Sequence, residues 1–222
     1  MIEGMNMKKI HVLAGGPQAY IPDLKQYEQE DVIWVGVDRG VYLLLKEEIS
    51  PTIAVGDFDS VTDQEWEFIR NHVKHLKQVQ PEKDETDMEL ALLWAMEQKP
   101  SIIRIFAATG GRLDHFLANI FMLTKDVYLS VDTTIEMIDT NNIISVHKPG
   151  IYSIEKDDEK KYISFLPMTS TVKGITLRGF KYPLTDRHIE RGSTLCISNE
   201  LIKRNGTFSF EKGILMMIRS KD

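Results

Sequence analysis

The spacing of apolar residues changes near residue 146, and this change restricts the chain to folds with two dissimilar halves. Before it, short apolar runs alternate with amphipathic stretches of helical length, which is typical of strand–helix units around a mostly parallel sheet. The expected strands are Ile10–Ala14, Val32–Val37, Ile53–Val55, Ile102–Ala107 and Val127–Val131. We therefore predict an N-terminal α/β domain over residues 1–145.

The second half consists of short β-rich runs broken by Gly, Pro, Asn and Asp residues. The expected strands here are Tyr162–Leu166, Gly174–Leu177, Thr194–Ser198, Thr207–Phe210 and Ile214–Ile218. This pattern predicts a C-terminal antiparallel β domain over residues 146–222, and a chain of 222 residues is long enough for two domains.

Composition excludes several classes of partner. The net charge is −6 with acidic residues spread along the chain, whereas a nucleic acid requires a basic face. The single cysteine, Cys196, cannot form an internal disulfide and belongs to no zinc-binding spacing. The first nine residues lack the apolar stretch of a signal peptide, and no run approaches the roughly 20 apolar residues that span a membrane. We expect a cytoplasmic protein with neither nucleic acid nor membrane as a partner.

Glycine and aspartate collect directly after the predicted strands of the first half. Ligands of open α/β sheets bind beyond the carboxyl ends of the strands, where the loops converge. These loops are Gly15-Gly16-Pro17, Asp38-Arg39-Gly40, Gly56-Asp57-Phe58-Asp59-Ser60 and Thr109-Gly110-Gly111-Arg112-Leu113-Asp114. Glycine lets the backbone approach an oxyanion closely, so both Gly-Gly pairs are candidate phosphate contacts, although a tight turn without a ligand explains either pair equally well.

Asp57 and Asp59 alternate around Phe58. In an extended segment both carboxylates project to one side and the phenyl ring to the core. Their mutual repulsion is relieved by a hard divalent cation, and magnesium is the natural candidate because it combines one or two carboxylates with substrate phosphates. The alternative is that both aspartates are turn and cap residues.

A further acidic group, Asp84-Glu85-Thr86-Asp87, begins a predicted helix over Asp87–Gln98. Thr62-x-x-Glu65 and Thr86-x-x-Glu89 are typical of capping boxes, so helices are expected to start near Asp63 and Asp87. The acidic residues would stabilise the positive helix end without any ligand. The same placement brings Asp87 to the sheet edge near Asp57 and Asp59, where a cluster of carboxylates suits phosphoryl transfer.

Two cations accompany these motifs. Arg112 suits a fork contact to phosphate, with a salt bridge to Asp114 as the structural alternative, and it precedes a predicted helix over His115–Leu123. Lys83 either offsets the negative charge around it or contacts phosphate.

Taken in order, these segments resemble the motif set of bacterial thiamine pyrophosphokinases. The matching segments are Asp38-Arg39-Gly40, Gly56-Asp57-Phe58-Asp59-Ser60, Lys83-Asp84-Glu85-Thr86-Asp87, Gly110-Gly111-Arg112-Leu113-Asp114-His115 with Asn119, Gly179-Phe180-Lys181-Tyr182-Pro183-Leu184 and Ser198-Asn199-Glu200. The resemblance covers nearly the whole chain, and the ordered set is far more specific than any one motif.

The resemblance implies an α/β ATP-binding domain followed by a β-sandwich domain that binds thiamine and forms a homodimer. It implies an enzyme that uses Mg²⁺ to move diphosphate from ATP to the thiamine hydroxyl, leaving AMP. The implied metal ligands are Asp57, Asp59, Asp84 and Asp87. The implied catalytic residues are Asp57, Asp59, Asp87 and Arg112, with either Asp87 or Asp59 as the base. The residues expected to contact nucleotide or thiamine are Gly15, Gly16, Asp38, Lys83, Thr86, Gly110, Gly111, Arg112, Asp114, Ser198 and Asn199.

The chain departs from the family pattern in one respect, and two alternative functions remain open. All three tryptophans lie in the first half, so Phe180 or Tyr182 would have to supply any aromatic ring with which the β domain stacks on thiamine. The first alternative function is a metal-dependent nucleotide phosphohydrolase, in which the same aspartates activate water. The second is a non-catalytic sensor of thiamine.

Overall fold

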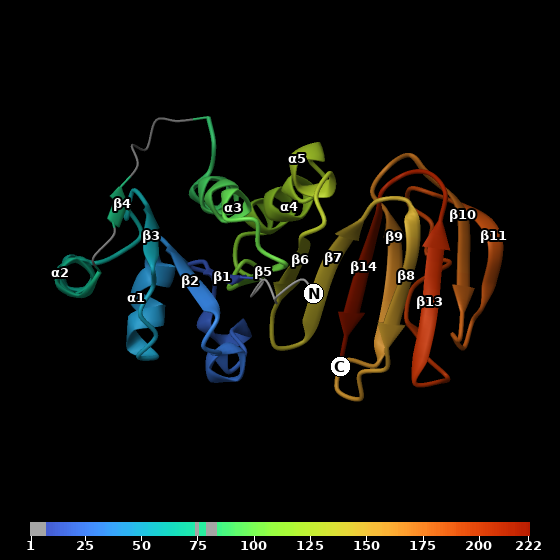
Figure 1. Ribbon diagram of the computed structural model, residues 1–222, viewed down its shortest axis with the longest axis horizontal. Coiled ribbons are helices and arrows are strands. Elements are labelled where there is room, and N and C mark those ends of the chain that lie inside the picture. The colour runs from blue at the N-terminus through green and yellow to red at the C-terminus, as the bar shows by residue number, and fades with distance from the viewer. Residues whose placement is uncertain (1–7, 74–75, 79–83) are drawn as a thin grey trace, which may run out of the picture. The chain divides into compact units, whose positions relative to one another are not determined.

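The computed structural model describes residues 8–73, 76–78 and 84–222 (Figure 1). Contacts divide the chain into two compact units. Unit 1 comprises Met1–Met122 and Val131–Thr140, and unit 2 comprises Leu123–Ser130 and Asn141–Asp222.

Unit 1 is built on parallel strands in the order β6-β5-β1-β2-β3-β4. The strands are β1 Lys9–Leu13, β2 Val32–Val37, β3 Ile53–Gly56, β4 Leu76–Gln78, β5 Ile102–Phe106 and β6 Thr134–Ile138. The predicted parallel sheet is confirmed. From β1 the chain adds β2, β3 and β4 on one side of β1, and it then returns to add β5 and β6 on the other side of β1. The loops after β1 and β5 therefore flank a topological switch point. Open α/β sheets bind their ligands at such a point.

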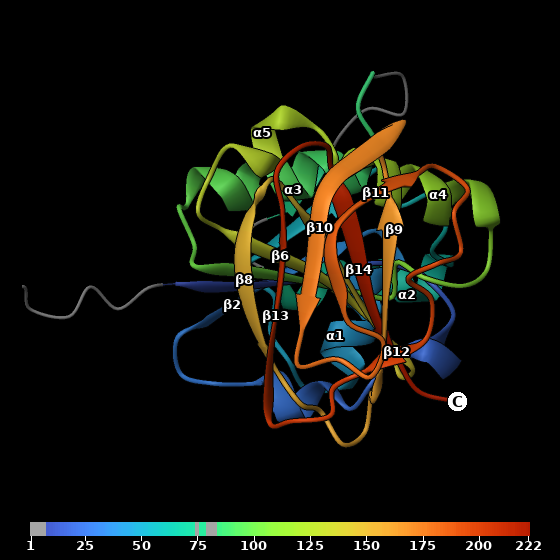
Figure 2. The same cartoon turned by 90° about the vertical axis from the view of Figure 1, so that its right-hand side faces the viewer.

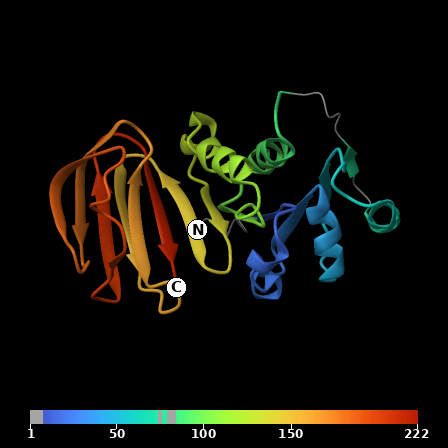
Figure 3. The same ribbon diagram turned by 180° about the vertical axis from the view of Figure 1, so that it is seen from behind.

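Helices cover both faces of this sheet (Figures 1 and 3). They are α1 Arg39–Lys46, α2 Asp63–His72, α3 Asp87–Glu97 and α4 Leu113–Met122, with short 3₁₀ turns η1 Gln18–Tyr20 and η2 Leu24–Tyr27. The predicted helix starts at Asp63 and Asp87 are confirmed. Thr62 and Glu65 form a complete capping box, and Thr86 Oγ1 accepts a hydrogen bond from the backbone N–H of Glu89 at 3.2 Å.

The strand predicted over Val127–Val131 is wrong. Most of this run lies in the short helix α5, Asp126–Leu129, and the strand that pairs with β5 is β6. Val127 and Val131 are exposed whereas Tyr128 between them is buried. A run this short has no periodicity that separates a strand from a turn of helix.

Unit 2 contains two antiparallel sheets, in the orders β12-β9-β14-β7 and β11-β10-β13-β8. Their strands are β7 Asn142–His147, β8 Gly150–Glu155, β9 Tyr162–Pro167, β10 Thr171–Arg178, β11 Leu184–Glu190, β12 Asn199–Glu200, β13 Asn205–Phe210 and β14 Leu215–Ser220. One buried cluster joins the sheets: Phe165 of β9 and Leu215 of β14 pack with Ile175 of β10 and Phe208 of β13. The sheets therefore form a sandwich, as Figure 2 shows for β10 and β13 in front of β14.

The strand predicted over Thr194–Ser198 is also wrong. Exposure does alternate there, with Cys196 buried between the exposed Leu195 and Ile197. However, the backbone forms local turn bonds: the N–H of Ile197 donates to the carbonyl of Thr194, and the N–H of Leu195 donates to Ser193 Oγ. Turns satisfy these groups in place of a ladder, and the strand β12 begins only at Asn199.

No helix in the described part of the chain combines the length and apolar character needed to cross a membrane.

Candidate active site

Three carboxylates meet at the carboxyl edge of the unit 1 sheet. Asp38 follows β2, Asp57 follows β3, and Asp87 is the first residue of α3. One oxygen from each lies within 4.8 Å of the other two. The structure thus brings together Asp57 and Asp87, both of which were predicted from the sequence to bind the metal. It adds Asp38, which was predicted to contact the nucleotide or thiamine.

An unusual backbone holds this group together. Asp38 and Phe58 both have positive φ, 48° and 62°, and Gly56 has φ 154°. A Cβ at Gly56 would lie 2.1 Å from Asp38 Oδ1, so glycine makes room for the carboxylate. The N–H of Phe58 donates to that same oxygen at 3.4 Å. The positive φ angles of Asp38 and Phe58 cost about 1 to 3 kcal/mol each, and strained residues of this kind gather at functional sites.

The side chain of Phe58 anchors the loop that carries Asp57. It is buried in a cluster with Val41, Ala54 and Ile69, which confirms that this ring points to the core. The extended geometry expected for the segment is wrong, because the positive φ of Phe58 turns the chain and the N–H of Asp59 donates back to Asp57 Oδ1 at 3.1 Å.

The electrostatics of the group suit a cation. Burial raises the pKa of Asp38 to about 7, and the charges of Asp87, Asp57 and Asp59 add to that rise while the hydrogen bond from Phe58 opposes it. Repulsion among carboxylates is relieved by a divalent ion, and three hard oxygen donors from three segments fit Mg²⁺. The residues present therefore fit the metal that the resemblance implies.

Asp59 and Asp84 do not join this group of three within the described residues. Both are exposed. Asp59 lies close enough for its charge to act on Asp38, whereas Asp84 precedes the cap of α3.

A salt bridge that the sequence analysis missed connects the two loops of the site. Arg39 Nη2 and Nε lie 2.9 and 3.1 Å from Glu65 Oε1, and Glu65 is also bonded to the N–H of Thr62. The hydrogen bond from Thr62 is the main cause of a lowered pKa of Glu65. Arg39 follows Asp38 directly, and α2 begins just after the Asp57 loop, so this pair fixes one loop relative to the other. Two features of the sequence could have indicated this salt bridge: an arginine directly after Asp38 and a glutamate in a capping box.

The two Gly-Gly loops pack against each other at the switch point. The N–H of Gly16 donates to the carbonyl of Ala107 at 2.9 Å, and a Cβ on Gly16 would lie 2.2 Å from that oxygen. Gly110 has φ 73°, and a Cβ there would lie 2.7 Å from the ring of Tyr20. Close packing thus explains both glycines without a ligand, and contact of Gly15, Gly16, Gly110 and Gly111 with phosphate stays a prediction.

The same loop holds a buried hydroxyl. Thr109 is 5% exposed, and its Oγ1 has no hydrogen-bond partner among the described residues. An unsatisfied buried group costs about 1 to 3 kcal/mol, so this hydroxyl favours a polar ligand or water beside the loop.

Arg112 and Asp114 form a salt bridge, which the sequence analysis gave as the structural alternative to a phosphate contact of Arg112. Arg112 Nη2 and Nε donate to Asp114 at 2.6 and 3.2 Å. This bond lowers the pKa of Asp114 to about 2. Both side chains are well exposed, and exposed pairs are weak, so Arg112 can exchange Asp114 for another anion.

Two further assigned residues precede α3 in the sequence. Thr86 caps the helix through its Oγ1, which is the structural role expected for it. Lys83 lies outside the described residues.

In unit 2, Asn199 holds the backbone of Tyr182. The side chain of Asn199 is 2% exposed; its Oδ1 accepts from the N–H groups of Tyr182 and Glu200, and its Nδ2 donates to the carbonyl of Tyr182. The neighbouring Ser198 is exposed, has φ 55°, and donates its N–H to Ser164 Oγ. Asn199 is therefore placed to orient a loop, whereas Ser198 is accessible to a ligand.

Of the two aromatic candidates in this loop, only Tyr182 is accessible. Phe180 is 1% exposed and belongs to the sandwich core, whereas Tyr182 is 58% exposed. Lys181 lies over the Tyr182 ring, 5.6 Å from its centroid, and is bonded to Glu200 at 3.1 Å.

Comparison with known proteins gives one consistent family. Residues 24–137 match the model described as the thiamin pyrophosphokinase catalytic domain, and residues 151–215 match its vitamin B1 binding domain. Thiamine pyrophosphokinase of Bacillus subtilis is 54% identical, over 97% of this chain and 100% of the relative. The crystal structure of the B. subtilis protein has a TM-score of 0.90 at 52% identity, covering 97% of this chain and 100% of that chain. That of the Geobacillus thermodenitrificans thiamin pyrophosphokinase has a TM-score of 0.90 at 50% identity, covering 96% and 98%. The resemblance drawn from the motifs is confirmed, and the chain belongs to the thiamine pyrophosphokinase family.

Proposed function

We propose that this chain, as a thiamine pyrophosphokinase, transfers the diphosphate of ATP to the hydroxyl of thiamine and releases AMP. The observation that carries the proposal is the group formed by Asp38, Asp57 and Asp87 at the carboxyl edge of the matched catalytic domain. In phosphoryl transfer, positioning and neutralisation of charge supply most of the catalysis, and this group can provide both.

Asp38, Asp57 and Asp87 would hold Mg²⁺ through one oxygen each. When bound, the ion neutralises charge on the polyphosphate and so lets an alcohol approach it. The chain's own part is to keep the three carboxylates together, which it does through Gly56 and the buried ring of Phe58.

Asp59 is our candidate for the general base. The sequence left Asp87 and Asp59 as alternatives, but Asp87 belongs to the group of three whereas Asp59 is exposed beside it. Asp59 would take the proton of the thiamine hydroxyl as its oxygen forms a bond to the β-phosphorus. The bond between that phosphorus and the oxygen bridging to the α-phosphorus breaks, and AMP leaves with the electron pair on that oxygen.

Arg112 would bind the nucleotide phosphates after it leaves Asp114. The exchange costs little because the pair is exposed, and the guanidinium fork matches phosphate oxygens as well as it matches a carboxylate.

Thiamine would meet unit 2 at Tyr182 and Ser198. The thiazolium of thiamine is a cation, and an accessible tyrosine ring attracts cations through its face. Tyr182 supplies that ring, with Asn199 acting as the positioning residue that fixes the Tyr182 backbone.

A homodimer is consistent with apolar side chains around the edge strand β12. Leu195, Ile197 and Ile202 are 54%, 41% and 64% exposed and lie within a few residues of Ser198. Exposed apolar side chains next to an edge strand are typical of an interface, and we propose a second copy of this chain as the partner. We therefore assign thiamine binding and dimerisation to residues 146–222, and ATP binding to residues 1–145.

We place the enzyme in the cytoplasm, a location that agrees with its free, buried Cys196.

The test is incubation with ATP and Mg²⁺, with and without thiamine, followed by mass spectrometry of the products. AMP and thiamine diphosphate that form only when thiamine is present would support transfer. Phosphate release independent of thiamine would favour the phosphohydrolase, for which the same aspartates would activate water. Thiamine binding without turnover would favour the sensor.

A further inference from the structure

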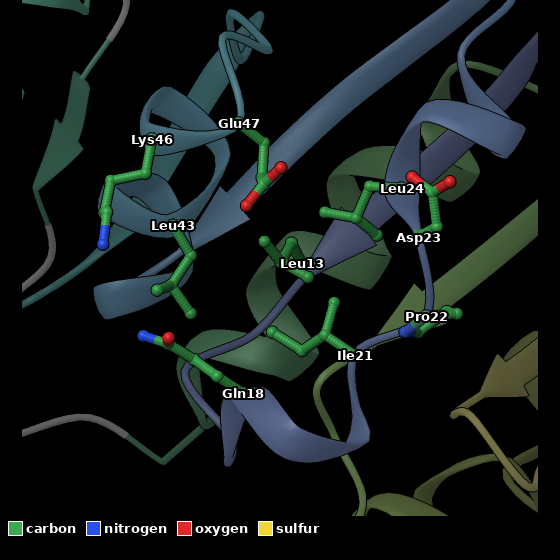
Figure 4. Close-up of a pocket in the computed structure, with 9 residues that line it drawn as sticks. All are labelled: Leu13, Gln18, Ile21, Pro22, Asp23, Leu24, Leu43, Lys46 and Glu47. Atoms are coloured by element: carbon green, nitrogen blue, oxygen red, sulfur yellow. The ribbon is translucent and has the colours of Figure 1, made fainter.

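Unit 1 contains a cavity of about 280 Å³ that is lined by none of the site residues described above. Its floor is apolar, and Figure 4 shows Leu13, Ile21 and Leu43 pointing toward one another across it. The polar residues that line it are all exposed: Gln18, Asp23, Lys46 and Glu47. The polar groups that select a ligand are usually few and placed within a pocket, so this cavity does not identify a ligand. A more specific arrangement lies on unit 2, around Tyr182.

A short piece of backbone pairing in unit 2 places Lys181 beside Glu200. Phe180 and Leu201 form an antiparallel bridge, and both side chains are buried. Next to this bridge, the N–H of Lys181 donates to the carbonyl of Glu200 at 2.8 Å. Successive side chains of extended segments point to opposite faces, so the neighbours of the buried pair present their side chains to solvent. The side chains of Lys181 and Glu200 are accordingly 50% and 33% exposed.

The ammonium group of Lys181 has two partners. Its Nζ lies 3.1 Å from Glu200 Oε1 and 5.6 Å from the centroid of the Tyr182 ring. The pKa of Lys181 is raised, mainly by the hydrogen bond to Glu200 and by the charge of that carboxylate. A cation of the chain itself therefore lies over the accessible ring of Tyr182.

The same two partners suit a thiazolium. An aromatic face attracts a cation, and a carboxylate beside it neutralises the charge. An ammonium is compact and strongly hydrated, whereas a thiazolium spreads its charge over a flat ring that can stack on the tyrosine. The two cations therefore compete for one place, and the face of the ring favours the thiazolium.

Lys181 can leave this place by a movement of its side chain alone. Ion pairs as exposed as that of Lys181 and Glu200 are weak, so little is lost when the ammonium turns to solvent. The backbone of Tyr182 is held by Asn199 through two hydrogen bonds that do not involve Lys181. The ring is thus available to a ligand without rearrangement of the loop.

A second lysine–tyrosine pair lies nearby and serves as a comparison. Lys161 Nζ lies 4.5 Å from the centroid of the Tyr162 ring, and Tyr162 is the Cα partner of Glu200 between β9 and β12. The charge of Glu200 acts on Lys161 as well. Tyr162 is less exposed than Tyr182, and its hydroxyl donates to Asp222 Oδ2 at 3.2 Å. Lys161 thus carries the same charge close to Glu200 without covering the ring of Tyr182.

We propose that Lys181 takes the place of the substrate's thiazolium in the free protein, and that Glu200 is the counter-ion of whichever cation is bound. The proposal rests on the proposed function, because it takes Tyr182 as the surface that binds thiamine. Thiamine replaces one cation by another, whereas a neutral ring displaces Lys181 and gives Glu200 no charge in return. The pair therefore makes the surface selective for cationic rings, and the competing lysine lowers the affinity for thiamine.

The experiment measures binding to the full chain by calorimetry, with Mg²⁺ and α,β-methylene-ATP present, a nucleotide whose bridge resists transfer. The probes are thiamine and its neutral analogue in which a thiophene ring replaces the thiazolium. Lys181→Met keeps the length of the side chain and removes its charge, so the dissociation constant for thiamine should fall about threefold to tenfold. Lys161→Met is the matched control, and its dissociation constant should stay within about twofold of that of wild type.

Glu200→Gln tests the counter-ion and leaves the backbone hydrogen bonds of this residue in place. It should reduce the preference for thiamine over the neutral analogue toward unity. A dissociation constant for thiamine that does not fall in Lys181→Met, or that falls equally in Lys161→Met, would overturn the inference while leaving the kinase assignment standing. An unchanged preference in Glu200→Gln would overturn it in the same way. If wild type binds no thiamine, the proposed function fails and this inference fails with it.

Discussion

Replacement of Asp38 by asparagine should make the metal-free protein more stable while it damages the enzyme. The carboxyl group keeps its proton up to a pH of about 7 in the folded state, whereas its ordinary pKa is 3.8. Between these values the unfolded chain has released the proton and the folded chain has not. The free energy of unfolding therefore falls as the pH rises from about 4 to 7, and the loss is complete above 7.

The size of the effect follows from the same two values. A rise from 3.8 to about 7 corresponds to at most about 4 kcal/mol. Asp38 is only partly buried, and water screens part of the repulsion, so we expect about 1 to 2 kcal/mol. Asparagine retains the acceptor for the N–H of Phe58 and carries no charge toward Asp57 and Asp87. Asp38→Asn should therefore gain about 1 to 2 kcal/mol at pH 8 in EDTA and nothing near pH 4.

Urea unfolding at pH 4, 6 and 8 measures this gain. All three tryptophans, Trp34, Trp66 and Trp94, lie in unit 1, so their fluorescence reports on the unit that contains the site. Asp84→Asn is the control, since Asp84 is exposed outside the group, and it should change the stability by less than about 0.5 kcal/mol. Added Mg²⁺ should stabilise wild type more than Asp38→Asn. A gain that is the same at pH 4 and pH 8, or a loss at pH 8, would refute the reasoning.

Four further substitutions test the remaining roles. Asp59→Asn should lower kcat about 100-fold or more and remove the acidic limb of the pH–rate profile while Mg²⁺ affinity, measured by calorimetry, is retained; unchanged turnover would exclude Asp59 as the base. Asn199→Ala should raise the KM for thiamine and destabilise unit 2 by about 1 to 3 kcal/mol, because the Tyr182 backbone loses its hydrogen-bond partners. Tyr182→Leu should raise the KM for thiamine without lowering the stability of unit 2. A normal KM in both variants would show that thiamine does not bind at Tyr182. Ile202→Glu should give monomers in sedimentation while the control Ile151→Glu stays dimeric; dimers of both would move the interface elsewhere.

The elements that could be predicted are those whose signal is local. The run Ile10–Ala14 overlaps β1, and Thr62 with Glu65 marks the start of α2, because each pattern is complete within a few residues. The two strands predicted wrongly had local signals that fit more than one structure. Val127–Val131 is as apolar as a strand but too short to reveal a period, and the alternation around Cys196 arises in a turn.

The site was predictable only to the level of the sheet edge. Residues that follow parallel strands end at one edge, so Asp57 and Asp87 could be expected to meet. Whether Asp38 joins them depends on Gly56, a residue of the neighbouring strand whose missing side chain leaves space for the Asp38 carboxylate. Likewise, nothing near Asn199 in the sequence reveals that its amide bonds Tyr182, which lies 17 residues earlier.

Contacts outside the group hold the three carboxylates together. Their repulsion and the positive φ angles of Asp38 and Phe58 both oppose the arrangement, so other contacts must stabilise it. The buried ring of Phe58 holds one loop, and the bond from Arg39 to Glu65 ties the other loop to α2. Because these contacts lie outside the group itself, removal of the metal should leave the loops in place. Cation binding then does not have to order the backbone, so its free energy contributes fully to binding of the polyphosphate.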